Sequence, residues 1–328
     1  MRTRRNHPRG PTLVAVLEEG LRAHYGANLR IRGLEAKPLM AFSTHPIERL
    51  YVALDDGRTL RVIFKRIEPG SEPGLGRERE VLLYERLLAG GRFGSPQLYA
   101  SVYDPRAGHY WLFLEDVGDW RLEYSGMGDW LAAFRWLART HAESYGRAEE
   151  LRALDCLAEH NGAFFYELWA AAHRQLAERG HPALARFERL GAGLERLVAE
   201  LLTMPQSLVH GDLSCHNLAV QPERTIRPLD WEWAAIGLPA WDVTRLASGW
   251  GDQRQRLLAL YCEEFGRHSP TPLDGAIFAR SLDACEIFQV CWYLRWWIAA
   301  CHQPAFVERS LDRMERHWQR LEGRSANG

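Results

Sequence analysis

The chain has 328 residues, of which 46% are hydrophobic and 25% are charged, as in ordinary globular proteins. A chain of this length favours two lobes over a single hydrophobic core. The formal net charge of −1 argues against a surface built for nucleic acid or for an anionic membrane.

The sequence predicts neither secretion nor a membrane span. The apolar run at 13–17 is too short for the core of a signal peptide. The most apolar segment, 287–301, is interrupted by Arg295 and is shorter than the roughly 20 residues of a membrane span. Six scattered cysteines include no Cys-x-x-Cys pair, which is typical of reduced thiols. The sequence therefore predicts a soluble, cytoplasmic protein.

The first third of the chain predicts a small sheet with a leading helix. The expected elements are a helix at 11–25 and strands at 29–42, 50–54 and 59–67. In the last of these strands Leu60, Val62 and Phe64 share one face, so Lys65 lies on the other. Only two of the 41 basic residues are lysines, and a lysine supplies a compact charge that arginine cannot reproduce.

A helix predicted at 77–88 carries a candidate partner for that lysine. Glu80 shares one side of the helix with Tyr84, and a carboxylate among apolar neighbours is costly unless it is paired. We therefore expect Glu80 to pair with Lys65 within about 4 Å. The alternative is that Glu80 is solvated, like other glutamates of the same helix.

The pattern then changes from strands to helices. Two further strands are expected, and the second leads into an acidic segment with a glycine at 115–118. Beyond it the apolar spacing is helical. The predicted strands lie at 97–103 and 110–115, and the predicted helices at 130–145, 162–178, 182–202, 254–265, 272–300 and 304–321. A further helix is expected to begin from the turn at 237–242 and to run through 246 to 250.

The most informative stretch is 208–217, which contains His210-Gly211-Asp212 and, five residues after the aspartate, Asn217. A short strand then ends in Asp230-Trp231-Glu232. Phosphoryl transfer needs a carboxylate that orients the attacking hydroxyl group and hard oxygen ligands for Mg²⁺. Alone, Asp212 reads as a turn residue after glycine, but its order and spacing with Asn217 and Asp230 favour a catalytic role.

Together these motifs resemble the protein-kinase catalytic loop and metal-binding triplet, with Gly in place of Arg and Trp-Glu in place of Phe-Gly. This variant is similar to the aminoglycoside phosphotransferase and choline kinase superfamily. The resemblance covers nearly the whole chain in element order, although its specific motifs cover only the centre and the Lys65 strand. It implies an α+β, bilobal, protein-kinase-like fold, with a nucleotide-binding lobe of antiparallel sheet at 1–117 and a larger, mainly helical lobe at 118–328 that holds the catalytic loop and the acceptor site.

The resemblance also implies roles for the central residues. Asp212 would accept or orient the proton of the acceptor hydroxyl group. Asn217 and Asp230 would bind Mg²⁺, and Glu232 would be a ligand of a second metal ion. Asp242 resembles the aspartate that holds the catalytic loop from the start of a helix.

For the nucleotide, the resemblance implies that Lys65 holds the α- and β-phosphates and is fixed by Glu80. Backbone groups of Glu115 and Val117 would contact adenine at the hinge between the lobes. The sequence departs from the pattern at 42–47, where a glycine-rich loop is expected and no glycine occurs. Ser43 is expected to donate hydrogen bonds to phosphate there.

Acceptor recognition is assigned to a later helix, in which four residues lie close to one stripe: Asp283, Glu286, Tyr293 and Trp297. An acidic and aromatic face would suit a cationic acceptor, through ion pairs or cation–π contacts. The alternative is that the tyrosine and the tryptophan are part of the core and that the two carboxylates are solvated.

We therefore predict an ATP- or GTP-dependent, Mg²⁺-dependent kinase that phosphorylates a hydroxyl group of a small molecule, such as an aminoglycoside, sugar or amino alcohol. Its partners are the nucleotide and the acceptor, with neither nucleic acid nor membrane. A catalytically silent nucleotide-binding module is the main alternative, supported by the missing glycines. A protein kinase is disfavoured by the His-Gly-Asp motif and by the lack of an Ala-Pro-Glu segment after Asp230.

Overall fold

The structure is a computed structural model that describes residues 12–39, 45–68, 76–301 and 304–325. The chain forms two compact units. The first comprises Met1–Arg121 with Ala219–Glu232, and the second comprises Leu122–Leu218 with Trp233–Gly328. The segment Ala219–Glu232 thus returns the chain to the first unit. A single division at residue 117 would assign this segment to the second lobe.

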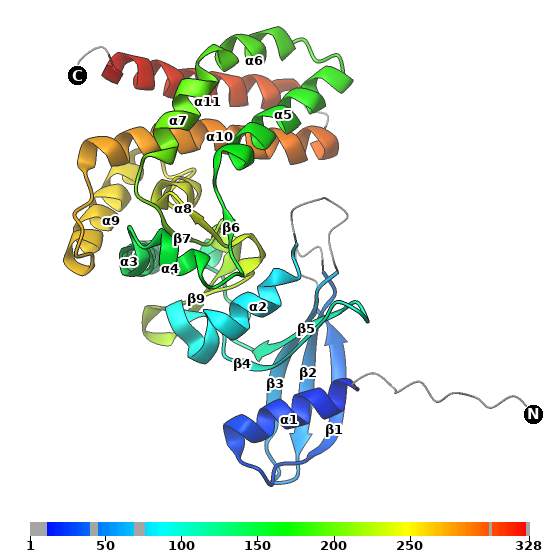
Figure 1. Ribbon diagram of the computed structural model, residues 1–328. Coiled ribbons are helices and arrows are strands. Elements are labelled where there is room, and N and C mark those ends of the chain that lie inside the picture. Colours follow the sequence, from blue (N-terminus) through cyan, green and yellow to red (C-terminus); the bar gives the residue numbers. More distant parts are fainter. Residues whose placement is uncertain (1–11, 40–44, 69–75, 302–303, 326–328) are drawn as a thin grey trace, which may run out of the picture. The chain divides into compact units, whose positions relative to one another are not determined.

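The first unit is built on an antiparallel five-stranded sheet in the order β1-β2-β3-β5-β4, and β8 and β9 form a separate pair. Figure 1 draws its helices and strands in blue to cyan, with the returning segment in yellow-green. Their bounds are α1 (Leu13–Tyr25), β1 (Ile31–Pro38), β2 (Ile47–Leu54), β3 (Thr59–Arg66), α2 (Arg79–Arg86), β4 (Leu98–Asp104), β5 (His109–Glu115), β8 (Leu218–Gln221) and β9 (Thr225–Pro228).

Alternation along β3 creates the core of this unit. Val62 and Phe64 are buried in one apolar cluster with Leu17 of α1, so α1 covers the face of the sheet to which they point (Figure 1). The ring of Phe64 stacks on that of Phe113 of β5, with centroids 4.8 Å apart. This arrangement confirms which side chains of the strand were predicted to face the core. It places Lys65 on the face opposite α1.

The second unit is mainly helical and contains a small sheet in the order β6-β10-β7. The two units together confirm the predicted α+β class. The bounds in the second unit are α3 (Met127–Ser144), α4 (Ala148–Arg152), β6 (Ala158–Glu159), α5 (Gly162–Glu178), α6 (Leu184–Leu190), α7 (Leu194–Leu202), β7 (Ser207–Val209), β10 (Ala235–Gly237), α8 (Pro239–Leu246), α9 (Arg254–His268), α10 (Gly275–Cys301) and α11 (Pro304–Ser325).

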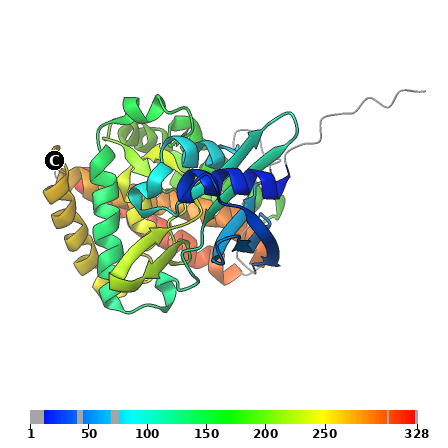
Figure 2. The same cartoon turned by 90° about the horizontal axis from the view of Figure 1, so that it is seen from below.

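Aromatic packing holds the small sheet against the helices. Trp241 of α8 is fully buried, and its ring lies 4.9 Å from that of His160 and 6.2 Å from that of Trp292 of α10, centroid to centroid. The long helices α10 and α11 lie side by side, and α3 packs along α9 (Figures 1 and 2). Within the second unit, β7 and β10 therefore pack against helices.

Two predicted helices differ from the structure. The helix expected at 182–202 is divided into α6 and α7 by a tight turn at Gly191–Gly193, where two glycines weaken the helix. The helix expected to reach residue 250 ends at Leu246.

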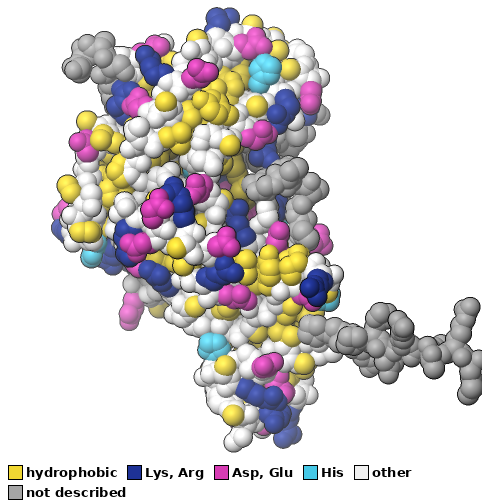
Figure 3. Space-filling model, in the orientation of Figure 1, with side chains coloured by type: hydrophobic (Ala, Val, Ile, Leu, Met, Phe, Trp, Pro, Cys, Tyr) yellow, Lys and Arg dark blue, Asp and Glu magenta, His cyan; other side chains and the backbone are white. Residues whose placement is uncertain are grey.

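Acidic and basic side chains are interspersed over the face shown in Figure 3, as the near-zero net charge leads one to expect. Among the described helices, none has an apolar stretch long enough to cross a membrane.

Candidate active site

Lys65 of β3 lies at the centre of a buried charge cluster in the first unit. Its Nζ donates to Oε2 of Glu80 at 2.7 Å and to Oδ1 of Asp230 at 2.5 Å. The other oxygen of Glu80 accepts the backbone N–H of Trp231 at 3.1 Å. The Lys65–Glu80 ion pair predicted from the sequence is present, and Glu80 additionally fixes the turn that carries Asp230.

Three carboxylates, those of Glu80, Asp230 and Glu232, act electrostatically on the ammonium group of Lys65. Burial alone lowers the pKa of Lys65, but the three carboxylates outweigh it and raise that pKa. Burial raises the pKa of Glu80, and the neighbouring carboxylates add to this, against the opposing effect of Lys65. Carboxylates gathered in this way would attract a divalent cation.

The backbone at Asp230 is unusual. Its φ is +61°, in the left-handed region that residues other than glycine enter infrequently, although aspartate does so more than most. Such conformations cost of order 1–3 kcal/mol and persist where surrounding contacts enforce them. Here the bond from Trp231 to Glu80 and the ion pair with Lys65 provide those contacts.

Glu232 is held by a histidine that the sequence did not single out. His45 Nε2 lies 2.8 Å from Oε2 of Glu232, and its Nδ1 accepts the backbone N–H of Glu68 at 3.2 Å. Because Nδ1 accepts, the proton of a neutral ring is on Nε2, which donates to the carboxylate. Ser43, which is expected to donate hydrogen bonds to phosphate, lies outside the described residues.

The second unit presents Asp212 on a sharp turn after β7. Gly211 has a φ of +84°, and a Cβ there would stand 2.0 Å from the backbone oxygen of Trp233. Only glycine fits this position, which explains why the motif contains Gly where the protein-kinase motif contains Arg. The indole Nε1 of Trp241 donates to the oxygen of Gly211 at 2.8 Å and fixes the same turn.

Asp242 at the start of α8 holds the turn from below. Its carboxylate accepts the backbone N–H groups of His210 at 2.6 Å and of Gly211 at 3.0 Å, and lies 3.3 Å from Nε2 of His141. The side chain is fully buried, which alone would raise its pKa, but the hydrogen bonds from His141 and His210 lower the pKa below its usual range. Asp242 is therefore an ionised anchor of the loop, as the resemblance implied.

Both oxygens of the Asp212 carboxylate have partners. Asn217 donates from Nδ2 to the backbone oxygen of Asp212 at 2.9 Å and to Oδ2 at 3.3 Å. Since the amide nitrogen faces Asp212, the amide oxygen of Asn217 points away from it. The guanidinium of Arg245 donates to Oδ1 of Asp212 and lies over the ring of Tyr293, 5.4 Å from its centroid.

Arg245 is a functional candidate that sequence reasoning missed. It lies on α8, one turn after Asp242, so the helix that anchors the loop also supports the carboxylate of Asp212. The signal was weak, because arginine is the default cation of this chain. The position one helical turn after a loop-holding aspartate is the clue that would have found it.

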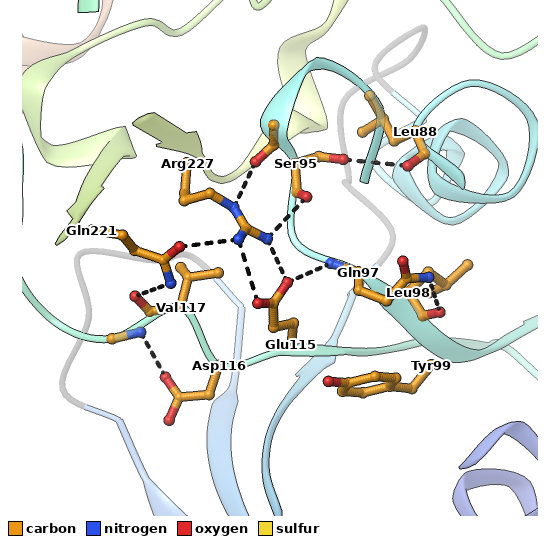
Figure 4. A network of polar contacts seen from close by, with 12 residues as sticks. Leu88, Ser95, Gln97, Leu98, Tyr99, Glu115, Asp116, Val117, Gln221 and Arg227 are labelled. Atoms are coloured by element: carbon orange, nitrogen blue, oxygen red, sulfur yellow. Dashed lines mark hydrogen bonds and ion pairs between the residues drawn. The ribbon is translucent and has the colours of Figure 1, made fainter. Parts of the chain in front are cut away.

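The proposed hinge residues belong to the network in Figure 4. The Glu115 carboxylate pairs with Arg227 of β9 and accepts the backbone N–H of Gln97 at 3.1 Å. The backbone oxygen of Val117 accepts from Nε2 of Gln221 at 3.3 Å. The side chain of Glu115 is thus committed within the protein, and its backbone N–H donates to the backbone oxygen of Gln97 at 2.8 Å.

Asp283 and Glu286 have surroundings that the sequence did not predict. Glu286 is buried and pairs with Arg254 of α9 at 2.9 Å and with Arg313 of α11. Asp283 is also buried and lies 2.7 Å from Nδ1 of His317 of α11. The charges of Asp283 and Glu286 are thus balanced by side chains of neighbouring helices, whereas Tyr293 of the same stripe contacts the guanidinium of Arg245. The side chain of Trp297 lies outside the described residues.

The candidate metal ligands are oxygen donors of the kind that Mg²⁺ prefers. Among the described residues, no three His, Cys, Asp or Glu side chains gather closely enough to hold a metal by themselves. Mg²⁺ is usually bound by one or two carboxylates together with substrate phosphates, so a complete protein cage is not required. Asp230 and the amide oxygen of Asn217 are hard oxygen donors of the appropriate kind.

Solved structures with the same fold come from several small-molecule kinases. A provisionally assigned aminoglycoside phosphotransferase of Ralstonia eutropha JMP134 is 17% identical with a TM-score of 0.57, over 93% of this chain and 98% of that one. The ethanolamine kinase of Plasmodium vivax is 15% identical with a TM-score of 0.54, over 87% and 81% of the two chains. The choline kinase of Streptococcus pneumoniae is 15% identical with a TM-score of 0.53, over 92% and 99%.

These similarities confirm the predicted protein-kinase-like fold. No curated protein matches the chain significantly. The model of the phosphotransferase enzyme family matches residues 47–273, a range that includes Lys65, Asp212, Asn217 and Asp230. Because this match spans more than half of the 328 residues, the chain belongs to the phosphotransferase enzyme family.

Proposed function

We propose that this phosphotransferase moves the terminal phosphoryl group of ATP or GTP, with Mg²⁺, to a hydroxyl group of a small molecule. In this step the bond from the γ-phosphorus to the leaving β-phosphate oxygen breaks, and a new bond forms to the acceptor oxygen. The hydroxyl proton leaves toward Asp212. The nucleoside diphosphate and a phosphate ester are the products.

The observation that carries the proposal is the way in which Asp212 is held. Its turn is fixed by two backbone hydrogen bonds to the buried Asp242, and its carboxylate contacts Asn217 and Arg245. A carboxylate that serves only as a turn residue needs no such support. A positioned carboxylate contributes to phosphoryl transfer chiefly by orienting the hydroxyl group.

For the nucleotide we propose that Lys65, fixed by Glu80, pairs with phosphate oxygens, and that backbone groups of Glu115 and Val117 bind the base. The 2.7 Å ion pair and the burial of Lys65 support the first assignment. We further propose that Ser43 donates hydrogen bonds to the nucleotide phosphates. Fold relatives have been solved with GDP and with AMP, so both nucleotide bases should be tested.

For the metal we propose Asp230 and Asn217 as ligands, with Glu232 as a further ligand. When bound, Mg²⁺ would neutralise charge on the phosphates and on the carboxylates near Lys65. We assign nucleotide binding to the lobe at 1–117 and acceptor binding to the lobe at 118–328. A cytoplasmic location, where both nucleotides are available, completes the proposal.

The acceptor classes to test follow from the fold relatives. Their names identify them as enzymes of aminoglycosides, ethanolamine and choline, all of which carry hydroxyl groups. Asp283 and Glu286 were our candidates for binding a cationic acceptor, and their pairing with Arg254, Arg313 and His317 reduces the support for that role. Neutral sugars therefore belong in the test beside aminoglycosides and amino alcohols.

The test is transfer of label from γ-labelled ATP or GTP in the presence of Mg²⁺. Each nucleotide is incubated with a panel of aminoglycosides, sugars and amino alcohols, and the products are separated. We expect labelled phosphate ester with one acceptor class, and none after the metal is chelated. Nucleotide binding without transfer to any acceptor or to water would instead identify a silent nucleotide-binding module.

A further inference from the structure

Arg227 of β9 uses every donor of its guanidinium group, as Figure 4 shows. Nε donates to the backbone oxygen of Gly94 at 2.8 Å, and Nη2 donates to that of Ser95 at 3.3 Å. Nη1 donates to Oε1 of Glu115 at 3.3 Å and to Oε1 of Gln221 at 3.1 Å. The fifth bond joins Nη2 to Oε2 of Glu115. A guanidinium has five N–H groups, so all are satisfied.

These bonds join parts of the first unit to which our proposed function assigns the base and the metal ion. Glu115 ends β5 at the hinge segment. Gln221 carries the network onward, because its Nε2 donates to the backbone oxygen of Val117. Arg227 itself precedes Asp230 by only three residues. The proposed base-binding segment and the proposed metal ligand are thus connected through one side chain.

A third connection leads toward Glu80. Gly94 and Ser95 lie in the turn that follows α2, and the hydroxyl group of Ser95 donates to the backbone oxygen of Leu88 at 3.3 Å. Leu88 lies two residues beyond the end of α2, the helix that presents Glu80 to Lys65. Arg227 therefore also contacts the turn that sets the position of α2.

A comparison within the chain separates this network from ordinary ion pairing. Arg186 of α6 is also multiply bonded, but its partners are three carboxylates of one helix, α11: Glu308, Asp312 and Glu315. That arrangement fastens one helix to another. The Arg227 side chain is 15% exposed against 22% for Arg186, and two of its five bonds fix backbone oxygens of a turn.

We propose that Arg227 is a positioning residue for the nucleotide. It sets the backbone at Glu115 and Val117 relative to Asp230, so that the base and the metal-bound phosphates of one nucleotide fit at the same time. This inference rests on the proposed function and goes beyond it, since Arg227 need not touch the ligand. A site that is ordered before binding gives higher affinity, because less freedom is lost when the ligand arrives.

The test compares Arg227→Lys with Arg186→Lys. Lysine keeps the charge but loses the planar fork, so it cannot reach the same set of acceptors. We measure the rise in melting temperature caused by Mg²⁺ with ATP or GTP, and the KM values of nucleotide and acceptor. For Arg227→Lys we expect a smaller rise, roughly a tenfold increase in nucleotide KM and a smaller change in kcat. Arg186→Lys should lower the baseline melting temperature and keep the nucleotide response.

A milder variant covers the case in which Arg227→Lys fails to fold. Gln221→Ala removes the hydrogen bond to Val117 and a single acceptor of Arg227, and should raise nucleotide KM several-fold with acceptor KM unchanged. If the variants that fold lose baseline stability but keep the wild-type nucleotide response, Arg227 is only structural and the inference is wrong. If no nucleotide stabilises the wild-type protein, the proposed function fails as well, so the two failures are distinguishable.

Discussion

Replacing Asp242 with Asn tests whether the catalytic loop depends on its buried anchor. The carboxylate accepts two backbone N–H groups, from His210 and Gly211, and contacts His141. The amide of Asn can accept only with its single oxygen, so its NH₂ group would face one of the two backbone donors. The change therefore removes one charge-assisted hydrogen bond, weakens a second, and leaves a buried N–H group without an acceptor.

The cost can be worked from these contacts. A hydrogen bond to a charged group contributes about 1.5–3 kcal/mol, and an unsatisfied buried donor costs about 1–3 kcal/mol. Some of this loss is offset because the variant no longer buries a charge. We expect the free energy of unfolding to fall by about 3 kcal/mol, which lowers the melting temperature of a unit of this size by about 6–12 °C. A displacement of about 1 Å at Asp212 would lower kcat by about 10²-fold.

Thermal unfolding and turnover below the melting temperature are the assays, with Thr244→Val as the control. Thr244 lies on the same helix and is buried, but its hydrogen bonds go to Ala240, Trp241 and Gln289. The control should lose stability and keep kcat. Wild-type stability and turnover in Asp242→Asn would refute the anchor role.

The pH dependence provides a second check on Asp242. Its pKa is lowered in the folded state, so its contribution to stability is complete above the usual aspartate range and is lost as the pH falls through the lower folded value. The stability difference between the wild-type protein and Asp242→Asn should therefore be constant near neutrality and should shrink in acid. A difference that grew in acid would contradict the sign.

Three other substitutions test the remaining assignments. Lys65→Arg should lower kcat by about 10²-fold or more, because the larger fork cannot replace a compact ammonium held 2.5 Å from Asp230; near-normal kinetics would remove the lysine from the site. Arg245→Gln should lower kcat by about tenfold with nucleotide KM unchanged, because Asp212 loses its support on one oxygen; an equal kcat would show that Asn217 alone orients the carboxylate. Glu286→Gln should lower the free energy of unfolding by about 3 kcal/mol, since two arginines lose their shared carboxylate; a raised acceptor KM at unchanged stability would restore its acceptor role.

The parts of the fold that were predictable are those with local signals. The alternation of apolar residues predicted which side chains of β3 face the core, and so placed Lys65 on the other face. Helical spacing then predicted Glu80 as the partner of Lys65, which the structure shows. By contrast, β6, β7 and β10 are two or three residues long, and no periodic pattern can develop over so few positions. They form because neighbouring segments pack around Trp241, which is a tertiary effect.

Partners far apart in the sequence explain most of the missed site residues. Glu286 and Asp283 were correctly placed on one helix, but the basic side chains that balance them come from α9 and α11. His45 meets Glu232 across 187 positions, which a pattern confined to one segment cannot reveal. Arg227 and Arg245 were hidden for a different reason, since arginine is the usual basic residue everywhere in this chain.

The central claim is that Asp212 orients a hydroxyl group for attack on a nucleotide phosphate. The most direct measurement is the rate of label transfer from the γ-phosphate to the identified acceptor, by the wild-type protein and by Asp212→Asn under the same conditions. We expect the variant to keep the rise in melting temperature produced by Mg²⁺ and nucleotide. Its rate of label transfer should fall by about 10²-fold or more. Transfer within a few-fold of the wild-type rate across a range of pH would contradict the claim.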